Sequence, residues 1–286
     1  ELPEVEVVKK SLQRNIVGLT IKKVLINNKN LRYKINVKDF RLLSNKKIKS
    51  IQRRSKYILI NLTKKITILV HLGMTGKFNL QEENKINKNL SFFYNRNKKI
   101  TKHDHVVFIF KEKKKLIYND VRRFGFIKIF LENKIVNNPH FQHLGPEPLS
   151  KNFNLDYFKK NILNKKRNIK DILMDQNFVS GLGNIYVNEI LYFSGINPTK
   201  LVNNLNHEEI KKILSYTGKI LKQSIKLGGS SIKDFEHSDG KQGKFQQKFT
   251  VYNRKGLECV KNNCKKLVKK KIISQRATYY CESCQK

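Results

Sequence analysis

The chain has 286 residues and a formal net charge of +38. This length suffices for two domains with separate hydrophobic cores, and no apolar run approaches the ~20 residues that span a membrane. The first segment is too acidic for a signal peptide, so we expect a soluble, cytoplasmic protein. Runs of Lys also occur on solvated faces that contact nothing, but so basic a chain makes nucleic acid the expected partner.

Acidic residues crowd the start of this basic chain. Three of its 22 Asp and Glu residues are Glu1, Glu4 and Glu6. One interpretation is a helix over residues 3–14, because Pro3 suits a first turn and carboxylates favour the positive end of a helix dipole. The other is chemistry, because an α-amine titrates near pH ~8 and becomes a neutral nucleophile beside a proton donor.

The following part of the chain is rich in strand-forming residues. Ile, Val, Leu and Phe dominate residues 21–26, 48–62, 66–72, 106–110 and 126–131, with Gly, Asn and Lys between these stretches. The pattern predicts an antiparallel β-sandwich. Residues 84–102 are polar and are predicted to form a long loop.

Three motifs in this part carry basic or aromatic side chains: Arg-Arg-Ser-Lys-Tyr at 53–57, His-Leu-Gly-Met at 71–74 and Asp-Val-Arg-Arg-Phe-Gly at 120–125. Strand alternation predicts that Arg54 and Lys56 share one face. Met74, Arg122 and Phe124 are side chains suited to wedging between stacked bases. Taken singly, each motif also fits an ordinary surface, turn or core position.

Beyond a Pro-rich segment the pattern becomes helical. Residues 137–148 hold three of the five prolines and predict a hinge. Asn206, with Glu209 three residues later, predicts a helix start. Gly-Leu-Gly-Asn-Ile-Tyr at 181–186 joins two predicted helices, and the amides of such a helix start suit a phosphate, with Asn184 beside them. Plain turn chemistry explains the same glycines equally well.

All four cysteines lie near the end of the chain. Cys259 and Cys264 are separated by four residues and Cys281 and Cys284 by two, with sixteen residues between the pairs. A hairpin that brings the pairs together offers four thiolates in a tetrahedron, the donor set of a structural zinc site. Two disulfides are the alternative, which an intracellular setting disfavours. Arg276 lies within the predicted hairpin, where a tip can reach DNA.

Taken in chain order, these blocks resemble those of the formamidopyrimidine-DNA glycosylases, bacterial enzymes that excise oxidised guanine. The further matching blocks are Glu-Leu-Pro-Glu-Val-Glu at 1–6, Lys-His-Asp-His at 102–105, Leu-Gly-Pro-Glu-Pro-Leu at 144–149, Ser-Asp-Gly-Lys at 238–241 and Gln-Arg-Ala-Thr at 275–278. The resemblance implies an α+β multidomain fold. Its expected parts are a catalytic β-sandwich domain over residues 1–135, a hinge over 136–150, a helix–two-turn–helix DNA-binding domain over 151–245 and a zinc ribbon over 246–286.

The resemblance also implies a base-excision repair enzyme that is both DNA glycosylase and AP lyase. In this family a Pro directly before the position of Glu1 attacks the sugar C1′ with its amine, and that Pro is not in the sequence. Glu1 matches the acid that shuttles protons at the opening sugar, Lys56 the proton donor of β-elimination and Arg276 the residue of δ-elimination. Either the Pro precedes Glu1 in the natural protein, which we expect, or the protein lacks the nucleophile.

The implied partner is double-stranded DNA that contains oxidised purines or abasic sites, bound by a monomer that holds one structural zinc ion. The positions that match DNA contacts are His103, Arg122, Lys165, Lys170, Asn184 and Arg276. Met74, Arg122 and Phe124 match the trio that fills the void left by a flipped nucleotide. Residues 233–240 match the loop over the flipped base, and helices near 169–193 match the helix–two-turn–helix.

Three alternatives remain. An endonuclease VIII-like enzyme would act on oxidised pyrimidines, although the Leu-Pro-Glu-Val opening and the Arg-Arg-Phe motif favour the purine enzyme. A catalytically inactive lesion-binding protein follows if the N-terminal Pro is truly absent. A zinc-ribbon RNA-binding protein explains the charge and the cysteines, but neither the N-terminal carboxylates nor the Gly-Asn-Ile-Tyr block.

Overall fold

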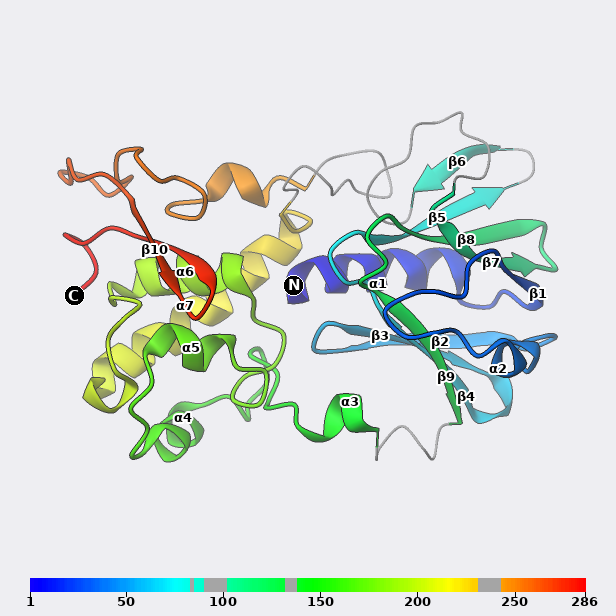
Figure 1. The fold of residues 1–286 in the computed structure, drawn as a ribbon, viewed down its shortest axis with the longest axis horizontal. Helices are drawn as coiled ribbons and strands as arrows, with labels where there is room; N and C mark the ends of the chain where they lie inside the picture. Colours follow the sequence, from blue (N-terminus) through cyan, green and yellow to red (C-terminus); the bar gives the residue numbers. More distant parts are fainter. Residues whose placement is uncertain (83–84, 90–101, 132–137, 231–242) are drawn as a thin grey trace. The chain divides into compact units, whose positions relative to one another are not determined.

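The computed structural model describes residues 1–82, 85–89, 102–131, 138–230 and 243–286 (Figure 1). The chain divides into two units. The sandwich unit comprises residues 4–142 and 228–244, and the helical unit comprises residues 1–3, 143–227 and 245–286. This division into two units does not test the boundaries of the four predicted domains, which remain predictions. Residues 136 and 137 of the predicted hinge and the whole predicted loop at 233–240 lie outside the described residues.

Two antiparallel sheets form the sandwich unit, as predicted. The first has the strand order β1-β7-β8-β5-β6, and the second has the order β2-β3-β4-β9. The strands are β1 (Ile21–Ile26), β2 (Ile48–Arg54), β3 (Tyr57–Leu62), β4 (Ile66–His71), β5 (Gly76–Glu82), β6 (Lys85–Asn89), β7 (Asp104–Phe110), β8 (Lys114–Asp120) and β9 (Phe126–Leu131). The helices that begin or lie in this unit are α1 (Leu2–Ile16), α2 (Val37–Arg41) and α3 (Pro139–Gln142).

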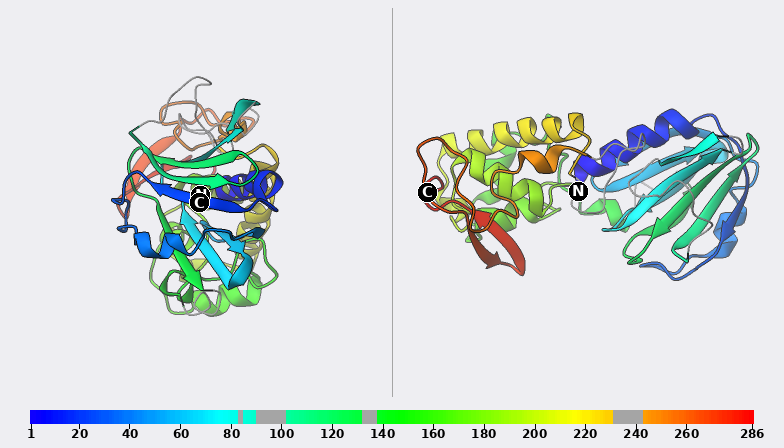
Figure 2. Two further views of the ribbon diagram at one scale, coloured as in Figure 1. Left: turned by 90° about the vertical axis from the view of Figure 1, so that its right-hand side faces the viewer. Right: turned by 90° about the horizontal axis from the view of Figure 1, so that it is seen from above.

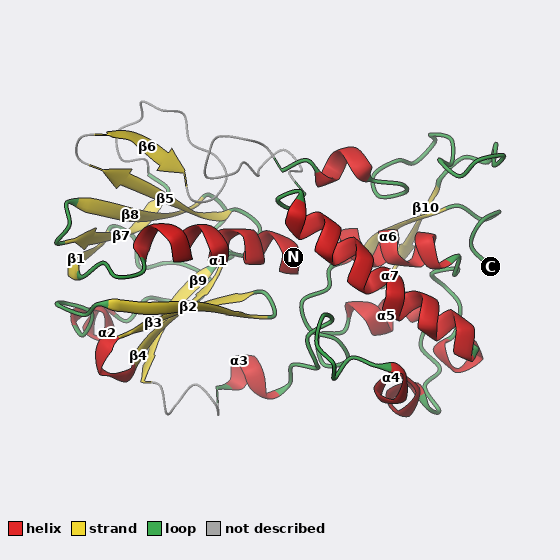
Figure 3. Ribbon diagram, turned by 180° about the vertical axis from the view of Figure 1, so that it is seen from behind, coloured by secondary structure: helices red, strands yellow, loops and turns green. Residues whose placement is uncertain are grey.

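The core of the sandwich unit follows the two periodicities of its elements. On β3, Ile58 and Ile60 point into the core, because side chains two apart share a face of a strand. On α1, Val8 and Leu12 lie one helical turn apart and pack into the same core. Figures 1 and 3 show α1 running between the two sheets. The predicted N-terminal helix is therefore present and serves as part of the core.

Two strand predictions were wrong in detail. The predicted continuous strand over residues 48–62 is a hairpin, because β2 ends at Arg54 and the chain turns at Ser55 and Lys56. Ser55 has a φ of 54°, which a strand interior does not allow. Arg54 and Lys56 therefore do not share a strand face. The predicted loop over 84–102 contains β6, and its residues 90–101 lie outside the described part of the chain.

Helices dominate the helical unit. They are α4 (Leu155–Ile162), α5 (Ile169–Met174), α6 (Asn184–Ser194) and α7 (His207–Lys226). Asn206 caps α7 in a reciprocal capping box with Glu209, as predicted. Figure 2 shows α6 and α7 side by side. Because α6 is covered by neighbouring elements, most of its residues are buried, and both polar and apolar side chains point inward.

The last part of the helical unit is a small ribbon. Strands β10 (Lys269–Ile273) and β11 (Arg276–Tyr280) pair in an antiparallel hairpin. The two-residue turn between them is Ser274-Gln275, with φ values of 46° and 60°, and two positive φ angles are typical of a tight hairpin. Arg276 therefore lies directly beside the hairpin tip, as predicted. Among the described residues, no helix has the length and apolar character needed to cross a membrane.

Candidate active site and metal centre

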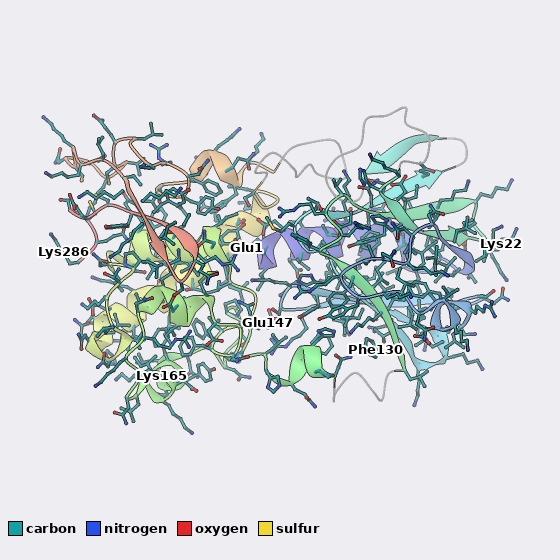
Figure 4. The ribbon with its side chains drawn as sticks, in the orientation of Figure 1. Glu1, Lys22, Phe130, Glu147, Lys165 and Lys286 are labelled. Atoms are coloured by element: carbon teal, nitrogen blue, oxygen red, sulfur yellow. The ribbon has the colours of Figure 1, made fainter. Side chains whose placement is uncertain are left out.

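The side chain of Glu1 lies at the start of α6 (Figure 4). Its Oε1 accepts a hydrogen bond from the Ile185 amide at 2.9 Å, and its Oε2 accepts one from the Tyr186 amide at 3.4 Å. The N-cap of α6 is Gly183, which offers no side-chain cap. The carboxylate therefore takes the place of a cap at the positive end of the helix dipole.

Two glycines before α6 leave room for the side chains of Glu1 and Leu2. A Cβ on Gly183 would overlap the side chain of Glu1, and a Cβ on Gly181 would overlap Leu2. Gly181 also has a φ of 96° and accepts a hydrogen bond from the Leu2 amide at 3.1 Å. The Gly-Leu-Gly-Asn-Ile-Tyr segment was predicted as a turn or a phosphate site. In the structure it is a turn that holds the side-chain carboxylate of Glu1.

Two predicted site residues converge on the hairpin that carries Arg276. The carbonyl oxygen of Ala277 accepts hydrogen bonds from Asn184 Nδ2 at 2.9 Å and from Lys170 Nζ at 3.1 Å. Lys170 also donates to Thr278 Oγ1 at 2.5 Å. The structure thus brings Glu1, Asn184, Lys170 and the part of the hairpin directly after Arg276 together within the helical unit.

Lys170 has an unusual environment for a lysine predicted to contact DNA. The residue is only 1% exposed, and burial lowers the pKa of its amine to about 8, with the charge of Arg276 acting in the same direction. Its amine donates hydrogen bonds to Ala277 and Thr278, so Lys170 stabilises the hairpin that carries Arg276. Arg276 and Lys165 are exposed, which a contact with a DNA phosphate would require. Figure 4 shows Lys165 at the surface of the helical unit.

In the sandwich unit, the predicted void-filling trio forms one exposed cluster. The guanidinium of Arg122 lies over the Phe124 ring, 4.6 Å from its centroid, and its Nη1 is 3.4 Å from the sulfur of Met74. Met74 is 58% exposed and Phe124 is 47% exposed. Apolar side chains this accessible are free to enter a base stack. Two loops that are far apart in sequence therefore present one mixed cationic and apolar tip.

A buried carboxylate joins these two loops, and the sequence analysis missed it. Asp120 is fully buried. Its Oδ1 accepts a hydrogen bond from Thr75 Oγ1 at 2.5 Å and its Oδ2 accepts one from the Gly125 amide at 2.8 Å. The Arg122 amide donates to Thr75 Oγ1 at 3.0 Å. The signal was an Asp two residues before the Arg-Arg-Phe motif, but its partner in the Met74 loop is not visible in the sequence.

Lys56 lies in the turn between β2 and β3 and is half-buried. The turn is held by Arg53, which donates to the Ser55 carbonyl oxygen at 2.9 Å and to Glu6 Oε2 at 2.8 Å. Burial opposes ionisation of Glu6, but the hydrogen bond and charge of Arg53, together with Lys9, hold the pKa of its carboxyl below the usual value. Glu6 and Arg53 thus position Lys56, a role that the sequence analysis did not identify.

Two histidines of the sandwich unit occupy different environments. His103 lies in a turn, and its carbonyl oxygen accepts a hydrogen bond from the Asp120 amide at 3.1 Å. His71 stacks on Phe126, with 5.5 Å between ring centroids, and its Nδ1 accepts from the Gly73 amide. Burial lowers the pKa of His71 to about 4, and the charge of Arg32 adds to this effect. His71 is therefore neutral near pH 7.

The four cysteines form one cluster at the base of the ribbon, and their sulfur atoms all lie within 4.8 Å of one another. The sulfur atoms of Cys259 and Cys284 are 3.8 Å apart, and those of Cys264 and Cys281 are 3.7 Å apart. A tetrahedral zinc ion with Zn–S bonds of about 2.3 Å requires sulfur separations of about 3.8 Å. The cysteines are free thiols, so their geometry fits a metal and not two disulfides.

Family models match most of the chain. The model described as the formamidopyrimidine-DNA glycosylase N-terminal domain matches residues 1–127, and the model described as the formamidopyrimidine-DNA glycosylase H2TH domain matches residues 144–236. Similar curated proteins bear the name formamidopyrimidine-DNA glycosylase. One from Rickettsia bellii is 41% identical over 286 residues, which are 100% of this chain and 99% of the relative. One from Rickettsia felis is 39% identical over 285 residues and 98% of its length.

Solved structures agree with these relatives. A complex of Lactococcus lactis Fpg with DNA containing an abasic site has a TM-score of 0.87 and 32% identity, covering 100% of this chain and 99% of the other. A complex of the same enzyme with DNA containing FAPY-dG has a TM-score of 0.86 and 31% identity, covering 100% of both chains. The chain therefore belongs to the formamidopyrimidine-DNA glycosylase family, and it is a DNA glycosylase of base-excision repair.

Proposed function

We propose that this glycosylase removes oxidised purines from duplex DNA through an imine formed by an N-terminal amine, and that it then cleaves the DNA backbone as an AP lyase. The observation that carries the proposal is the Glu1 carboxylate, which two amides of α6 hold in place at 2.9 and 3.4 Å. In this family the nucleophilic Pro directly precedes that residue. An amine one residue before Glu1 would therefore have a fixed proton-transfer group as its neighbour.

The proposed chemistry balances in three steps. The amine attacks C1′ with its lone pair, the bond between C1′ and the base breaks, and the base leaves with the bonding electrons and gains a proton. Glu1 supplies a proton to the sugar ring oxygen as the ring opens, which leaves a cationic iminium. The iminium acidifies the neighbouring C2′ protons. In β-elimination one C2′ proton passes to water, a C2′–C3′ double bond forms, and the C3′–O bond breaks so that the 3′ phosphate leaves, with Lys56 as proton donor. A second elimination expels the 5′ phosphate, with Arg276 assigned to that step.

We assign residues to DNA contacts in the helical unit and, separately, in the sandwich unit. Asn184, Lys165 and Arg276 are assigned to phosphates in the helical unit. Lys170 supports the Arg276 hairpin and is assigned to the phosphate near the lesion. In the sandwich unit His103 is assigned to the backbone, and Met74, Arg122 and Phe124 are assigned to the void, with Arg122 toward the orphaned cytosine. Solved complexes of similar proteins with lesion-containing DNA support such DNA as the partner.

We further propose that Cys259, Cys264, Cys281 and Cys284 bind one structural zinc ion. The sulfur separations of 3.7 and 3.8 Å support this assignment. Four thiolates leave no open position on a tetrahedral ion, so the metal would hold the ribbon together and take no part in the reaction. The Arg276 hairpin ends at Tyr280, next to Cys281, so metal binding would fix the base of the hairpin.

Product analysis tests the proposed activity. The natural protein is incubated with end-labelled duplexes that contain 8-oxoguanine opposite cytosine, thymine glycol opposite adenine, or no lesion. We expect faster cleavage of the 8-oxoguanine duplex, with a one-nucleotide gap that carries phosphates on both sides. Preferred cleavage of the thymine glycol duplex would favour an endonuclease VIII-like enzyme. Tight lesion binding without any base release would favour an inactive lesion-binding protein.

A further inference from the structure

One donor to the cysteine cluster comes from outside the ribbon. Tyr192, near the C-terminal end of α6, has its hydroxyl oxygen 3.1 Å from the sulfur of Cys259. Tyr192 is 8% exposed and Cys259 is 6% exposed, so water does not replace this contact easily. A metal-bound cysteine is a thiolate that has no proton to give. The tyrosine hydroxyl must then be the donor.

We propose that Tyr192 is a positioning residue of the metal centre, which donates a hydrogen bond to the metal-bound thiolate of Cys259 and thereby retains the ion. The proposal rests on the zinc centre proposed above. Hydrogen bonds to metal ligands orient them and tune the metal, and their loss typically weakens binding by about 10- to 100-fold. Four thiolates and one Zn²⁺ carry a net charge of about −2, so a buried donor also offsets part of the cost of desolvation.

Contacts of the neighbouring residues on α6 hold the Tyr192 hydroxyl in place beside Cys259. One helical turn before Tyr192, Asn188 accepts a hydrogen bond from the Tyr279 amide through its Oδ1 at 2.7 Å. Glu189, on the same helix, is fully buried and accepts hydrogen bonds from the amides of residues 250–252. These contacts attach α6 to the chain on both sides of Cys259. The position of the Tyr192 hydroxyl is therefore set by the fold.

The ring and the hydroxyl of Tyr192 have separate roles, which Tyr192→Phe can distinguish. It packs in a small core with Val251, Val268 and Cys281, a role that a phenylalanine ring would fill equally well. The hydroxyl adds a polar atom to this core, and an unpaired buried hydroxyl is unfavourable. The hydrogen bond to Cys259 satisfies it. Replacement of Tyr192 by Phe therefore separates the two roles, because it keeps the packing and removes the donor.

The test compares zinc release from full-length wild-type protein, Tyr192→Phe and Tyr186→Phe. Tyr186 is the matched control, because it is also a buried tyrosine of α6 and its hydroxyl lies 2.6 Å from Ser224 Oγ, away from the cysteines. Zinc transfer to a chromogenic chelator gives the rate of release. The cobalt-substituted proteins give the thiolate-to-cobalt charge-transfer band, which reports the donor strength of the sulfurs.

We expect Tyr192→Phe to release zinc about 10- to 100-fold faster than wild type and to shift the charge-transfer band. Tyr186→Phe is expected to retain the wild-type rate and band. Wild-type release and an unshifted band in Tyr192→Phe would overturn the role of Tyr192, as would equal effects in both variants. Wild-type protein purified without stoichiometric zinc would instead overturn the proposed zinc centre, so the two failures are distinguishable.

A second measurement needs no variant and covers the case in which Tyr192→Phe does not fold. Wild-type protein loaded with ¹¹³Cd is examined by NMR. A hydroxyl proton that donates to a metal-bound sulfur shows scalar coupling to the cadmium nucleus through the hydrogen bond. We expect this coupling for the Tyr192 hydroxyl proton. An assigned Tyr192 hydroxyl proton without coupling to cadmium would overturn the proposal.

Discussion

At the residue scale, two amides at the start of α6 hold the carboxylate of Glu1, and Gly183 leaves the space for it. A carboxylate placed this way would keep a fixed position during the proposed proton transfer. On the sandwich unit, the buried Asp120 plays a comparable part for the loops that carry Met74 and Arg122. In both cases a functional side chain depends on a partner from a distant part of the sequence.

Replacement of Glu1 by Gln tests the proton-transfer role. The amide oxygen can still accept the Ile185 hydrogen bond, but an amide cannot exchange a proton with the sugar oxygen. We expect single-turnover release of 8-oxoguanine to fall by at least about 100-fold, with little change in the Kd for the lesion duplex. Glu208→Gln, at an exposed residue of α7, is the matched control. Excision by Glu1→Gln near the wild-type rate would contradict the assignment.

Replacement of Phe124 by Ala tests the wedge. The ring is 47% exposed and lies under the Arg122 guanidinium, so its loss should cost little stability. We expect slower base excision and weaker preference for the lesion duplex over undamaged DNA, while the salt dependence of binding stays unchanged because no phosphate contact is lost. Leu42→Ala, at an exposed apolar residue of the same unit, is the control. Equal excision rates for wild type and Phe124→Ala would disprove the role.

At the element scale, α6 connects several functional parts of the helical unit. Its first turn holds Glu1, Asn184 bonds the hairpin at Ala277, and Tyr192 reaches Cys259. The hairpin is short, and its Lys-rich outer strand has little apolar surface to bury. Its stability therefore depends on α6 at one side and on the cysteine cluster at its base.

Replacement of Cys281 by Ser tests this dependence. A ribbon this small gains its fold from the metal, so metal binding and folding are coupled. We expect Cys281→Ser to lose zinc and to bind both lesion and undamaged duplexes more weakly, whereas the sandwich unit keeps its unfolding transition. Zinc analysis and a DNA titration at one fixed salt concentration provide the measurements. Full DNA affinity in the zinc-free variant would show that the hairpin holds its shape without the metal.

The sequence predicted those elements whose signals are local. The capping box at Asn206 and Glu209 marks α7, and stretches rich in Ile, Val, Leu and Phe mark β1, β4 and β9. β8 escaped prediction because only three of its seven residues are apolar. The turn at Ser55 was missed because a left-handed residue between two apolar strands leaves no Gly or Asn signal.

Site residues divide in the same way. Resemblance to a family predicted Glu1 and the trio Met74, Arg122 and Phe124 as site residues, and spacing predicted that the four cysteines come together. The burial of Lys170 was not predictable, because its amine is bonded to Thr278, 108 positions further along the chain. The contact of Tyr192 with Cys259 spans 67 positions and was missed for the same reason. Contacts between distant residues depend on the packing of whole elements.

At the scale of the whole molecule, the charge of +38 makes DNA affinity strongly dependent on salt. Charge also affects how the free energy of unfolding depends on pH. In a basic chain, cationic neighbours add to burial in lowering the pKa of a histidine in the folded state. The clearest case is His71 in the sandwich unit, whose pKa burial lowers to about 4. His140 shows a lowered pKa as well, through burial and the charge of Lys128.

These histidines predict acid sensitivity of the sandwich unit. Between pH 6.5 and 4 the unfolded chain binds a proton at His71 that the folded chain does not bind, so stability falls as pH falls. At pH 4 the loss from this residue is about 3 kcal/mol. Denaturant unfolding of wild type and His71→Gln across this window measures it, and the variant should show the shallower dependence. Identical slopes would contradict the burial of a neutral His71.

The most direct test of the central claim is chemical trapping of the reaction intermediate. The natural protein, with its N-terminus sequenced, is mixed with an 8-oxoguanine:cytosine duplex and sodium borohydride, and the cross-linked peptide is mapped by mass spectrometry. The account predicts a covalent complex linked through the amine of a Pro directly before Glu1. A complex linked elsewhere, or no complex despite tight binding to the lesion duplex, would contradict it.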